Sequence, residues 1–298
     1  MPPSLMRAAR IHEYGDAGVI RFEDVPRPVP GPGEVLVRMA ATSFNVSEIG
    51  LRKGLLQGIL DITLPHTLGW DLAGTVEEAG PGVTGLAPGD AVHGLVSGTA
   101  AEYAVARADE LAAAPTAIPL EHVAAIPVAG LTAWNAVFDE GGIGPGQRVL
   151  INGAGGAIGM FAVQLAKRAG AHVIATAAPR SREAVWRLGP DEVVDYTAEP
   201  LPGGMDVVLN LAAVPEADAA ALAPLGKLIV TAATPIDAPH ARHFTTGNDP
   251  ARLAELAALI DKGELVVDIA ETHPLTALPD LHRRAEAGRT RGKIIITL

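Results

Sequence analysis

The sequence predicts an α/β fold in two parts: a mostly β domain and, inserted into it, a doubly wound domain with a parallel sheet. Before Pro119, short strand candidates alternate with turns such as Pro30–Gly33. After Pro119, continuous Val- and Ile-rich runs alternate with longer helical patterns, which is typical of strands buried on both faces of a parallel sheet. The closing segment Lys293–Leu298 is again a strand pattern, so we expect it to rejoin the first domain.

The first part covers residues 1–118, and residues 266–298 are predicted to return to it. Its strand candidates are short and are separated by turns that contain Pro and Gly. They are Val35–Met39, Gly74–Glu78, Ala91–His93 and Ala101–Val105.

The inserted part covers residues 119–265. One predicted helix ends with Lys167 and Arg168 before Gly170, a combination typical of a helix C-terminus. A later helix has Asp249 as its N-cap and Pro250 at its first position. The strand candidates are Arg148–Asn152, His172–Thr176, Glu192–Tyr196, Asp206–Asn210 and Lys227–Thr231.

Composition excludes several classes of function. The 298 residues carry a formal net charge of −11, which disfavours nucleic acid and anionic lipid as partners. There is no cysteine, so disulfides and thiolate-bound metals are excluded. No apolar run is long enough to cross a membrane, and Met1–Arg7 resembles a short leader before the first strand rather than a signal peptide. We therefore expect a soluble cytoplasmic protein that acts on a small-molecule substrate.

A glycine-rich turn between the first predicted strand and helix of the inserted part indicates a dinucleotide site. Small residues there let the backbone approach a pyrophosphate, and the helix N-terminus offers unpaired N–H groups and a partial positive charge. The predicted contact residues run consecutively and are Asn152, Gly153, Ala154, Gly155, Gly156, Ala157, Ile158 and Gly159.

The residues after the second strand decide which dinucleotide binds. An NAD site usually has an acidic residue there to bind the ribose 2′-hydroxyl, but no acid lies near Ala177. Arg180, Ser181 and Arg182 instead suit a 2′-phosphate. The alternative is that the two arginines only solvate a helix start. The prediction is NADPH.

Taken together, these motifs resemble the medium-chain dehydrogenase/reductase superfamily, in particular its zinc-free, quinone oxidoreductase-like branch. The strongest markers are Gly130–Trp134, Gly144–Gly159, Asp191–Tyr196 and Gly288–Lys293. The resemblance implies a GroES-like substrate domain, a Rossmann domain, a cleft between them and hydride transfer from NADPH. It also implies a homodimer, in which the strand Lys227–Thr231 at a sheet edge pairs with its symmetry mate.

The zinc-dependent branch carries a catalytic Cys and a Gly-His-Glu motif, and both are changed here. Asn45 stands at the Cys position, while Trp70 and Asp71 replace the His and Glu. An amide and an indole do not suit a tetrahedral zinc site, so no metal is expected. His240 and His243 lack carboxylate partners at suitable spacing, which favours a solvated loop.

Four further residues are candidates for the site, each with a structural alternative. Asn45 is predicted to donate a hydrogen bond to substrate; the alternative is that it only caps a turn. By the resemblance, Thr132 lies near the nicotinamide; otherwise it begins a helix. Trp70 either lines the substrate pocket or packs in the core. Tyr196 either contacts the cofactor or only ends a strand.

The resemblance also reveals one departure. Relatives place a Tyr where this chain has Gly50, which leaves water, Ser47 or Lys53 as alternatives for the proton donor. The leading hypothesis is an NADPH-dependent reductase of quinones or enones. The alternatives are an enoyl-thioester reductase of a fatty acid or polyketide pathway and a redox-inactive NADPH-binding sensor.

Overall fold

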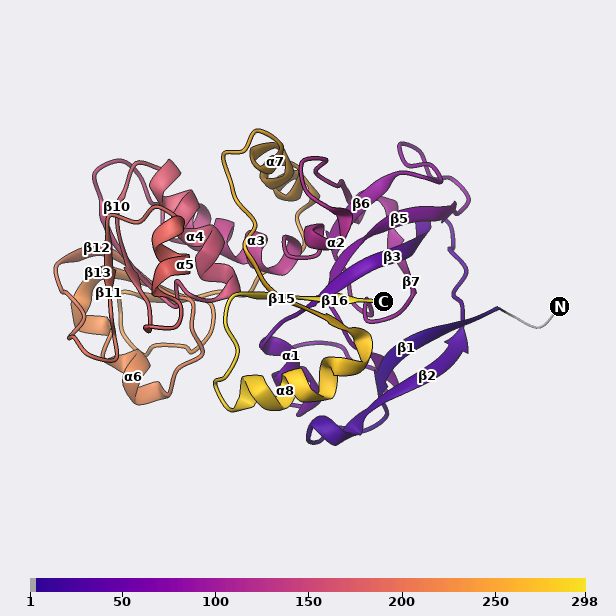
Figure 1. Cartoon of the computed structure of the whole chain (residues 1–298), viewed down its shortest axis with the longest axis horizontal. Coiled ribbons are helices and arrows are strands. Elements are labelled where there is room, and N and C mark those ends of the chain that lie inside the picture. The colour runs from indigo at the N-terminus through magenta and orange to yellow at the C-terminus, as the bar shows by residue number, and fades with distance from the viewer. Residues whose placement is uncertain (1–3) are drawn as a thin grey trace. The chain divides into compact units, whose positions relative to one another are not determined.

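In the computed structural model, residues 4–298 are described (Figure 1). The chain forms two compact units. Unit 1 comprises Met1–Val128, Asn248–Lys262 and Ile269–Leu298, and unit 2 comprises Ala129–Gly247 and Gly263–Asp268. Residues 1–3 of the predicted leader lie outside the described part. The first strand, β1, begins at Leu5, within the predicted leader Met1–Arg7.

Unit 1 contains two sheets. Strand β3 is central to the larger sheet and is antiparallel to its neighbours β16, β5 and β7. The order of the larger sheet is β15 (Ile269–Pro274), β16 (Lys293–Thr297), β3 (Glu34–Phe44), β5 (Asp71–Ala79), β6 (Ala91–Leu95) and β8 (Ala112–Ala113), with β7 (Tyr103–Arg107) paired to β3. The smaller sheet has the order β2 (Ile20–Pro26), β1 (Leu5–Ile11) and β4 (His66–Thr67).

The helices of unit 1 bury the apolar faces of these sheets. Helix α2 packs against β3, β5 and β16, and α7 packs against β6 and β8. As the sequence predicts, α7 begins at Pro250, and the Asp249 carboxylate accepts a hydrogen bond from the Arg252 N–H. The helical elements are η1 (Ala17–Val19), α1 (Ser47–Arg52), η2 (Ala108–Glu110), α2 (Leu120–Val123), α7 (Pro250–Asp261), η5 (Leu275–Ala277) and α8 (Leu278–Glu286).

Unit 2 is a doubly wound domain around one parallel sheet. If its strands are numbered along the chain, their order is 3-2-1-4-5-6, which is that of the Rossmann fold. The order is β11 (Glu192–Val194), β10 (His172–Thr176), β9 (Arg148–Asn152), β12 (Met205–Asn210), β13 (Gly226–Thr231) and β14 (Ala241–His243). The helical elements are α3 (Pro127–Trp134, shared with the end of unit 1), the π-helical η3 (Asn135–Glu140), α4 (Ala157–Arg168), α5 (Arg182–Arg187), α6 (Glu216–Ala220) and η4 (Ala223–Leu225).

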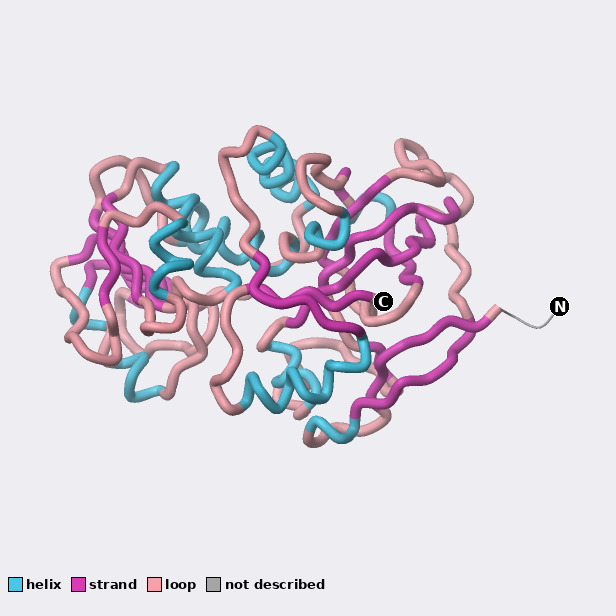
Figure 2. Tube along the Cα trace, in the orientation of Figure 1, coloured by secondary structure: helices cyan, strands magenta, loops and turns pink. Residues whose placement is uncertain are grey.

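Within unit 2, burial on both faces of the sheet explains why the strand sequences are apolar throughout. Val149, Leu150 and Ile151 of β9 are all fully buried, because neighbouring strands lie on both sides and helices cover the sheet. Figure 2 shows α4 and α5 beside the strands of this unit, and α4 contacts β9 and β10. The first βαβ element thus has the form that the sequence predicts.

Two sequence-based expectations differ from the structure. The predicted inserted domain ran to residue 265, but α7 clusters with unit 1, where the Asp261 carboxylate accepts hydrogen bonds from the N–H groups of Thr116 and Ala117. The prediction that Lys227–Thr231 is an edge strand is wrong. This segment, β13, lies between β12 and β14, so Ala241–His243 forms the edge.

Candidate functional site

The glycine turn of unit 2 lies where β9 ends and α4 begins. Gly153 has a φ of +91°, a conformation that an L side chain rarely adopts. At Gly159, a Cβ would lie 2.3 Å from the Gly153 carbonyl oxygen and 2.5 Å from the Cα of Ala154. Only glycine therefore lets α4 pack so closely against the strand end. The turn has the backbone form expected of a phosphate-binding loop.

No side chain caps the N-terminus of α4. Gly156 is the N-cap, and a Cβ there would meet only the Gly153 carbonyl oxygen, at 3.3 Å. The predicted residues Ala157 and Ile158 form the first turn of the helix. Helices leave their first N–H groups without an intrahelical acceptor, and these groups carry the positive end of the helix dipole. Space for an approaching backbone ligand and donors for an anion thus occur together.

Hydrogen bonds from polar side chains fix the start of the glycine turn at the end of β9. The Asn152 side chain donates to Asn210 Oδ1 at 2.9 Å and accepts from the Thr176 hydroxyl at 3.1 Å. The same hydroxyl accepts from the Gly153 N–H at 3.1 Å. Asn152, predicted as a cofactor residue, therefore fixes the end of β9 relative to β10 and β12.

The segment after β10 brings the other predicted cofactor residues near this turn. A Cβ on Gly155 would lie 2.7 Å from Ser181 Oγ, so the turn and Ser181 are in close contact. Ser181 is buried and its hydroxyl donates to the Ala178 carbonyl at 3.2 Å, whereas Arg180 and Arg182 are exposed. Ala177 is buried and its N–H donates to the Val194 carbonyl, which fixes the path of the backbone.

Tyr196 lies just after the next strand, β11. The Tyr196 side chain is 49% exposed, as its two sequence interpretations both allow. The neighbouring Asp195 accepts hydrogen bonds from the Thr197 hydroxyl and N–H, and these bonds, with a smaller attraction from Arg182, lower its pKa. Arg182 therefore has an acidic neighbour that the sequence interpretation did not consider.

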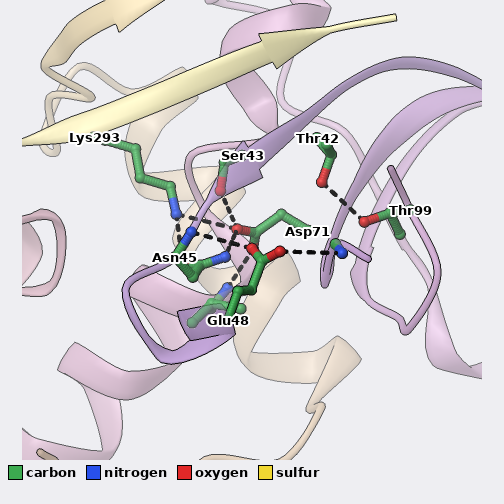
Figure 3. A network of polar contacts seen from close by, with 9 residues as sticks. Thr42, Ser43, Asn45, Glu48, Asp71, Thr99 and Lys293 are labelled. Carbon is green, nitrogen blue, oxygen red and sulfur yellow. Dashed lines mark hydrogen bonds and ion pairs between the residues drawn. The ribbon is translucent and has the colours of Figure 1, made fainter. Parts of the chain in front are cut away.

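Unit 1 contains a buried polar cluster that the sequence did not single out as a group. We call Ser43, Asn45, Asp71 and Lys293 the Lys293 cluster (Figure 3). Asn45 follows β3, Asp71 begins β5 and Lys293 begins β16. Because β3 is antiparallel to both neighbours, the end of β3 and the starts of β5 and β16 lie side by side, and these three positions meet there. Lys293 and Asp71 are fully buried.

Hydrogen bonds connect every member of the Lys293 cluster. The Lys293 ammonium donates to Asp71 Oδ2 at 3.1 Å and to Asn45 Oδ1 at 2.9 Å. Asn45 Nδ2 donates to Asp71 Oδ2 at 2.8 Å, and the Ser43 hydroxyl donates to the same oxygen. Asp71 Oδ1 accepts from the Val128 N–H at 2.7 Å. Asn45 is therefore not a turn cap, since its side chain binds a carboxylate and an ammonium.

Glu48 is adjacent to the Lys293 cluster and is also buried. Its two carboxyl oxygens each accept a hydrogen bond at 3.2 Å, one from the Asn45 N–H and one from the Gly69 N–H. Burial raises the pKa of Glu48 from its usual 4.5 to about 7, and the nearby Asp71 adds to this rise while the two N–H donors and Lys293 oppose it. Glu48 is thus poised to titrate near neutral pH.

The remaining candidates divide between the two interpretations. Thr132 is buried within α3 rather than at its start. Trp70 is half-buried and packs against the apolar core of unit 1. Ser47 is exposed at the first position of α1, and Lys53 forms a 2.9 Å ion pair with Glu286. Gly50 faces Leu56, whose side chain lies 3.7 Å from where a Cβ would be.

The described chain has neither a group of metal-binding side chains nor a membrane-spanning helix. Within residues 4–298, no three His, Cys, Asp or Glu side chains are placed to hold a metal ion. His240 hydrogen-bonds the Ala223 carbonyl oxygen at 2.9 Å, and His243 lies on the edge strand β14. No helix in that part of the chain is long and apolar enough to cross a membrane.

Known proteins are similar to this chain in both sequence and fold. The alcohol dehydrogenase GroES-like domain family matches residues 31–116, and the zinc-binding dehydrogenase family matches residues 188–296. A chloroplast envelope quinone oxidoreductase homolog of Arabidopsis thaliana is 38% identical over 206 residues, which are 66% of this chain and 63% of the relative. The chain belongs to the medium-chain dehydrogenase/reductase superfamily, in its zinc-free, quinone oxidoreductase-like branch.

Two other similarities extend over the whole chain. The structure of a quinone oxidoreductase from Coxiella burnetii matches with a TM-score of 0.89 and 26% identity over 99% of both chains. A protein of the spectinabilin polyketide synthase system, NorB of Streptomyces orinoci, is 34% identical over 100% of this chain and 15% of its own length. Unit 1 therefore corresponds to the GroES-like domain and unit 2 to the Rossmann domain, as the sequence predicts.

Proposed function

We propose that the protein is an NADPH-dependent, zinc-independent oxidoreductase that reduces a quinone or an α,β-unsaturated carbonyl compound. The observation that carries the proposal is the glycine turn at the uncapped N-terminus of α4, followed after β10 by a segment with two exposed arginines and no acid. Membership of the quinone oxidoreductase-like branch supports the type of acceptor.

The residues of unit 2 suit this cofactor. The turn leaves room beside Gly156 and places helix donors there for a pyrophosphate. Arg180 and Arg182 are proposed to bind the 2′-phosphate together with Ser181, and Tyr196 to lie beside the adenosine end. Thr132 is proposed to face the nicotinamide. When bound, NADPH supplies the hydride of the reaction.

The protein's part in the chemistry is to bind and polarise the acceptor. We propose that the Asn45 carboxamide donates a hydrogen bond to the acceptor's carbonyl oxygen and that Trp70 lines the substrate pocket. The acceptor gains a hydride and then a proton, so an enone becomes a saturated ketone and a quinone becomes a hydroquinone. Lys53 forms an ion pair with Glu286, so we propose water or the exposed Ser47 as the source of the proton.

The cofactor proposal is tested by replacing both arginines with alanine. Each charge-assisted contact to a phosphate is worth about 1.5–3 kcal/mol. Partial exposure lowers this, so we expect Arg180→Ala with Arg182→Ala to weaken NADPH binding by about 10- to 100-fold. NADH binding should stay within about twofold of the original. The matched control is Arg187→Ala. Arg187 is exposed, lies on α5 as Arg182 does, and pairs with Glu183. An unchanged preference for NADPH over NADH in the double variant would refute the assignment.

A second function has its own support. Similarity to NorB over the whole chain favours an enoyl-thioester reductase, which would reduce an enoyl group carried on coenzyme A or a carrier arm. The net charge of −11 argues against a basic surface for such an arm. NADPH oxidation with matched quinones, enones and enoyl-CoA compounds separates the two functions by kcat/KM. Tight NADPH binding without turnover on any acceptor would instead favour a redox-inactive sensor.

We also propose a cytoplasmic homodimer. Among residues 4–298, β14 pairs with β13 alone, so the Rossmann sheet has an edge available at Ala241–His243. Light scattering on the purified protein should give twice the chain mass of 30.6 kDa. A mass equal to that of one chain at all concentrations would contradict the dimer.

A further inference from the structure

The orientation of the Asn45 carboxamide depends on two charged neighbours. The ammonium of Lys293 can only donate hydrogen bonds, and the ionised carboxylate of Asp71 can only accept them. Asn45 presents its oxygen to Lys293 and its nitrogen to Asp71 (Figure 3). Turning the amide over would set NH₂ against an ammonium and oxygen against a carboxylate. Both hydrogen bonds would then become repulsions, so one orientation is enforced.

The two charges are themselves held in place. Asp71 accepts from Ser43, Asn45 and Lys293 at one oxygen and from the Val128 N–H at the other. These donors come from β3 and the residue that follows it, from β16, and from the start of α3. Lys293 opens β16, which lies between β15 and β3. The carboxylate therefore cannot rotate without breaking several bonds at once, and Lys293 remains beside it.

One donor of the Asn45 amide is left over. The Asn45 amide has two N–H groups, and Asp71 accepts one of them. Within residues 4–298, Asn45 Nδ2 donates to Asp71 and makes no second hydrogen bond. Asn45 is 7% exposed, so the side chain is mostly desolvated but not sealed from solvent. An N–H fixed in direction and poorly hydrated is suited to bind a ligand oxygen.

We propose that Lys293 is a positioning residue for the proposed reduction: with Asp71 as its counter-ion, it orients Asn45 so that the remaining N–H serves the acceptor's carbonyl oxygen. The proposal rests on the proposed function. It gives a buried side-chain cation the organising role at the position where zinc-dependent relatives bind their metal. It also explains why a lysine is fully buried at the start of an otherwise apolar strand.

The test is a double-mutant cycle on Lys293→Met and Asn45→Ala. Removing one donor to a developing negative charge costs about 100-fold in kcat, so each single variant should lose about that factor. If Lys293 acts through Asn45, the double variant should be no slower than Asn45→Ala alone. Losses that multiply would overturn the proposal. Lys293→Arg, which keeps the charge, should recover part of kcat, and Lys227→Met, an exposed lysine, should leave it unchanged.

A second measurement does not depend on activity, and it uses a variant chosen to avoid misfolding. Lys293→Met leaves a buried carboxylate unpaired, so the neutral double variant Lys293→Met with Asp71→Asn is made as well. The Asn45 side-chain signal in a proton–nitrogen correlation spectrum is assigned by its loss in Asn45→Ala. Its protons should be protected from exchange in the wild type and should exchange rapidly in the neutral variant. Equal protection in both would overturn the proposal.

The two readouts also separate this proposal from the proposed function. A wild-type protein that shows protected Asn45 protons, released in the neutral variant, but reduces no acceptor would refute the reductase function alone. An active wild type whose neutral variant keeps full kcat would refute the role of Lys293 alone.

Discussion

Glu48 makes the stability of unit 1 depend on pH in a direction opposite to that of most carboxylates. Its pKa rises from 4.5 to about 7 on folding, because burial disfavours the charged form. The folded state therefore binds a proton more tightly than the unfolded state does. The stabilisation is complete below pH 4.5 and is lost as the pH rises towards 7 and beyond.

The size of the effect follows from the same values. A rise from 4.5 to about 7 spans about 2.5 pH units, and at about 1.4 kcal/mol per unit this is about 3 kcal/mol. Glu48→Gln is neutral at every pH and removes this dependence. It also loses an acceptor for one of the two N–H donors, which changes the free energy of unfolding by an amount that does not vary with pH.

The assay is denaturant unfolding of both proteins between pH 4.5 and 8, followed by tryptophan fluorescence; Trp70 lies in the same unit as Glu48. The stability of the wild type relative to Glu48→Gln should fall by about 3 kcal/mol across this range. Glu199→Gln, at an exposed position, is the control and should show no such trend. A constant difference between wild type and Glu48→Gln would refute the reasoning.

Two further predictions follow from buried contacts. Gly159→Ala places a Cβ within 2.5 Å of the Gly153 and Ala154 backbone, so it should destabilise unit 2 by about 1–3 kcal/mol and weaken NADPH binding in a fluorescence titration. Gly144→Ala, whose Cβ meets nothing within 4 Å, should change neither, and equal effects would contradict the packing argument. His93 is fully buried with no partner for either ring nitrogen among the described residues, and burial lowers its pKa to about 4. His93→Leu should therefore raise the free energy of unfolding by about 1 kcal/mol, and a loss of that size would show that the imidazole has a role.

The sequence predicted the local features of the Rossmann domain closely. β9 and β10 have the predicted bounds, because continuous apolar runs between polar ends mark buried parallel strands well. The helix that begins at Pro250 was predicted from its cap, which is a local signal. The same signal does not indicate which sheet a helix covers, and α7 packs on the GroES-like unit instead.

The Lys293 cluster could not be predicted, because its members are far apart in the chain. Asn45 was predicted as a single hydrogen-bond donor to substrate, Asp71 was noted only for the ligand that it replaces, and Lys293 only as part of a family motif. Their meeting depends on the pairing of β16, β3 and β5, which no local pattern specifies. A lysine beginning the run Ile294–Ile296 was the one available signal of a buried charge. Likewise, β14 is short and exposed, so its sequence did not reveal the true edge of the parallel sheet.

The central claim is that the glycine turn and the arginines after β10 bind NADPH for the reduction of a polarised double bond. The most direct measurement is steady-state oxidation of NADPH and of NADH by the wild-type protein, treated with a metal chelator, with matched quinone and enone acceptors. We expect turnover that survives the chelator and a kcat/KM for NADPH at least about tenfold above that for NADH. Turnover that prefers NADH, or that requires added zinc, would contradict the account.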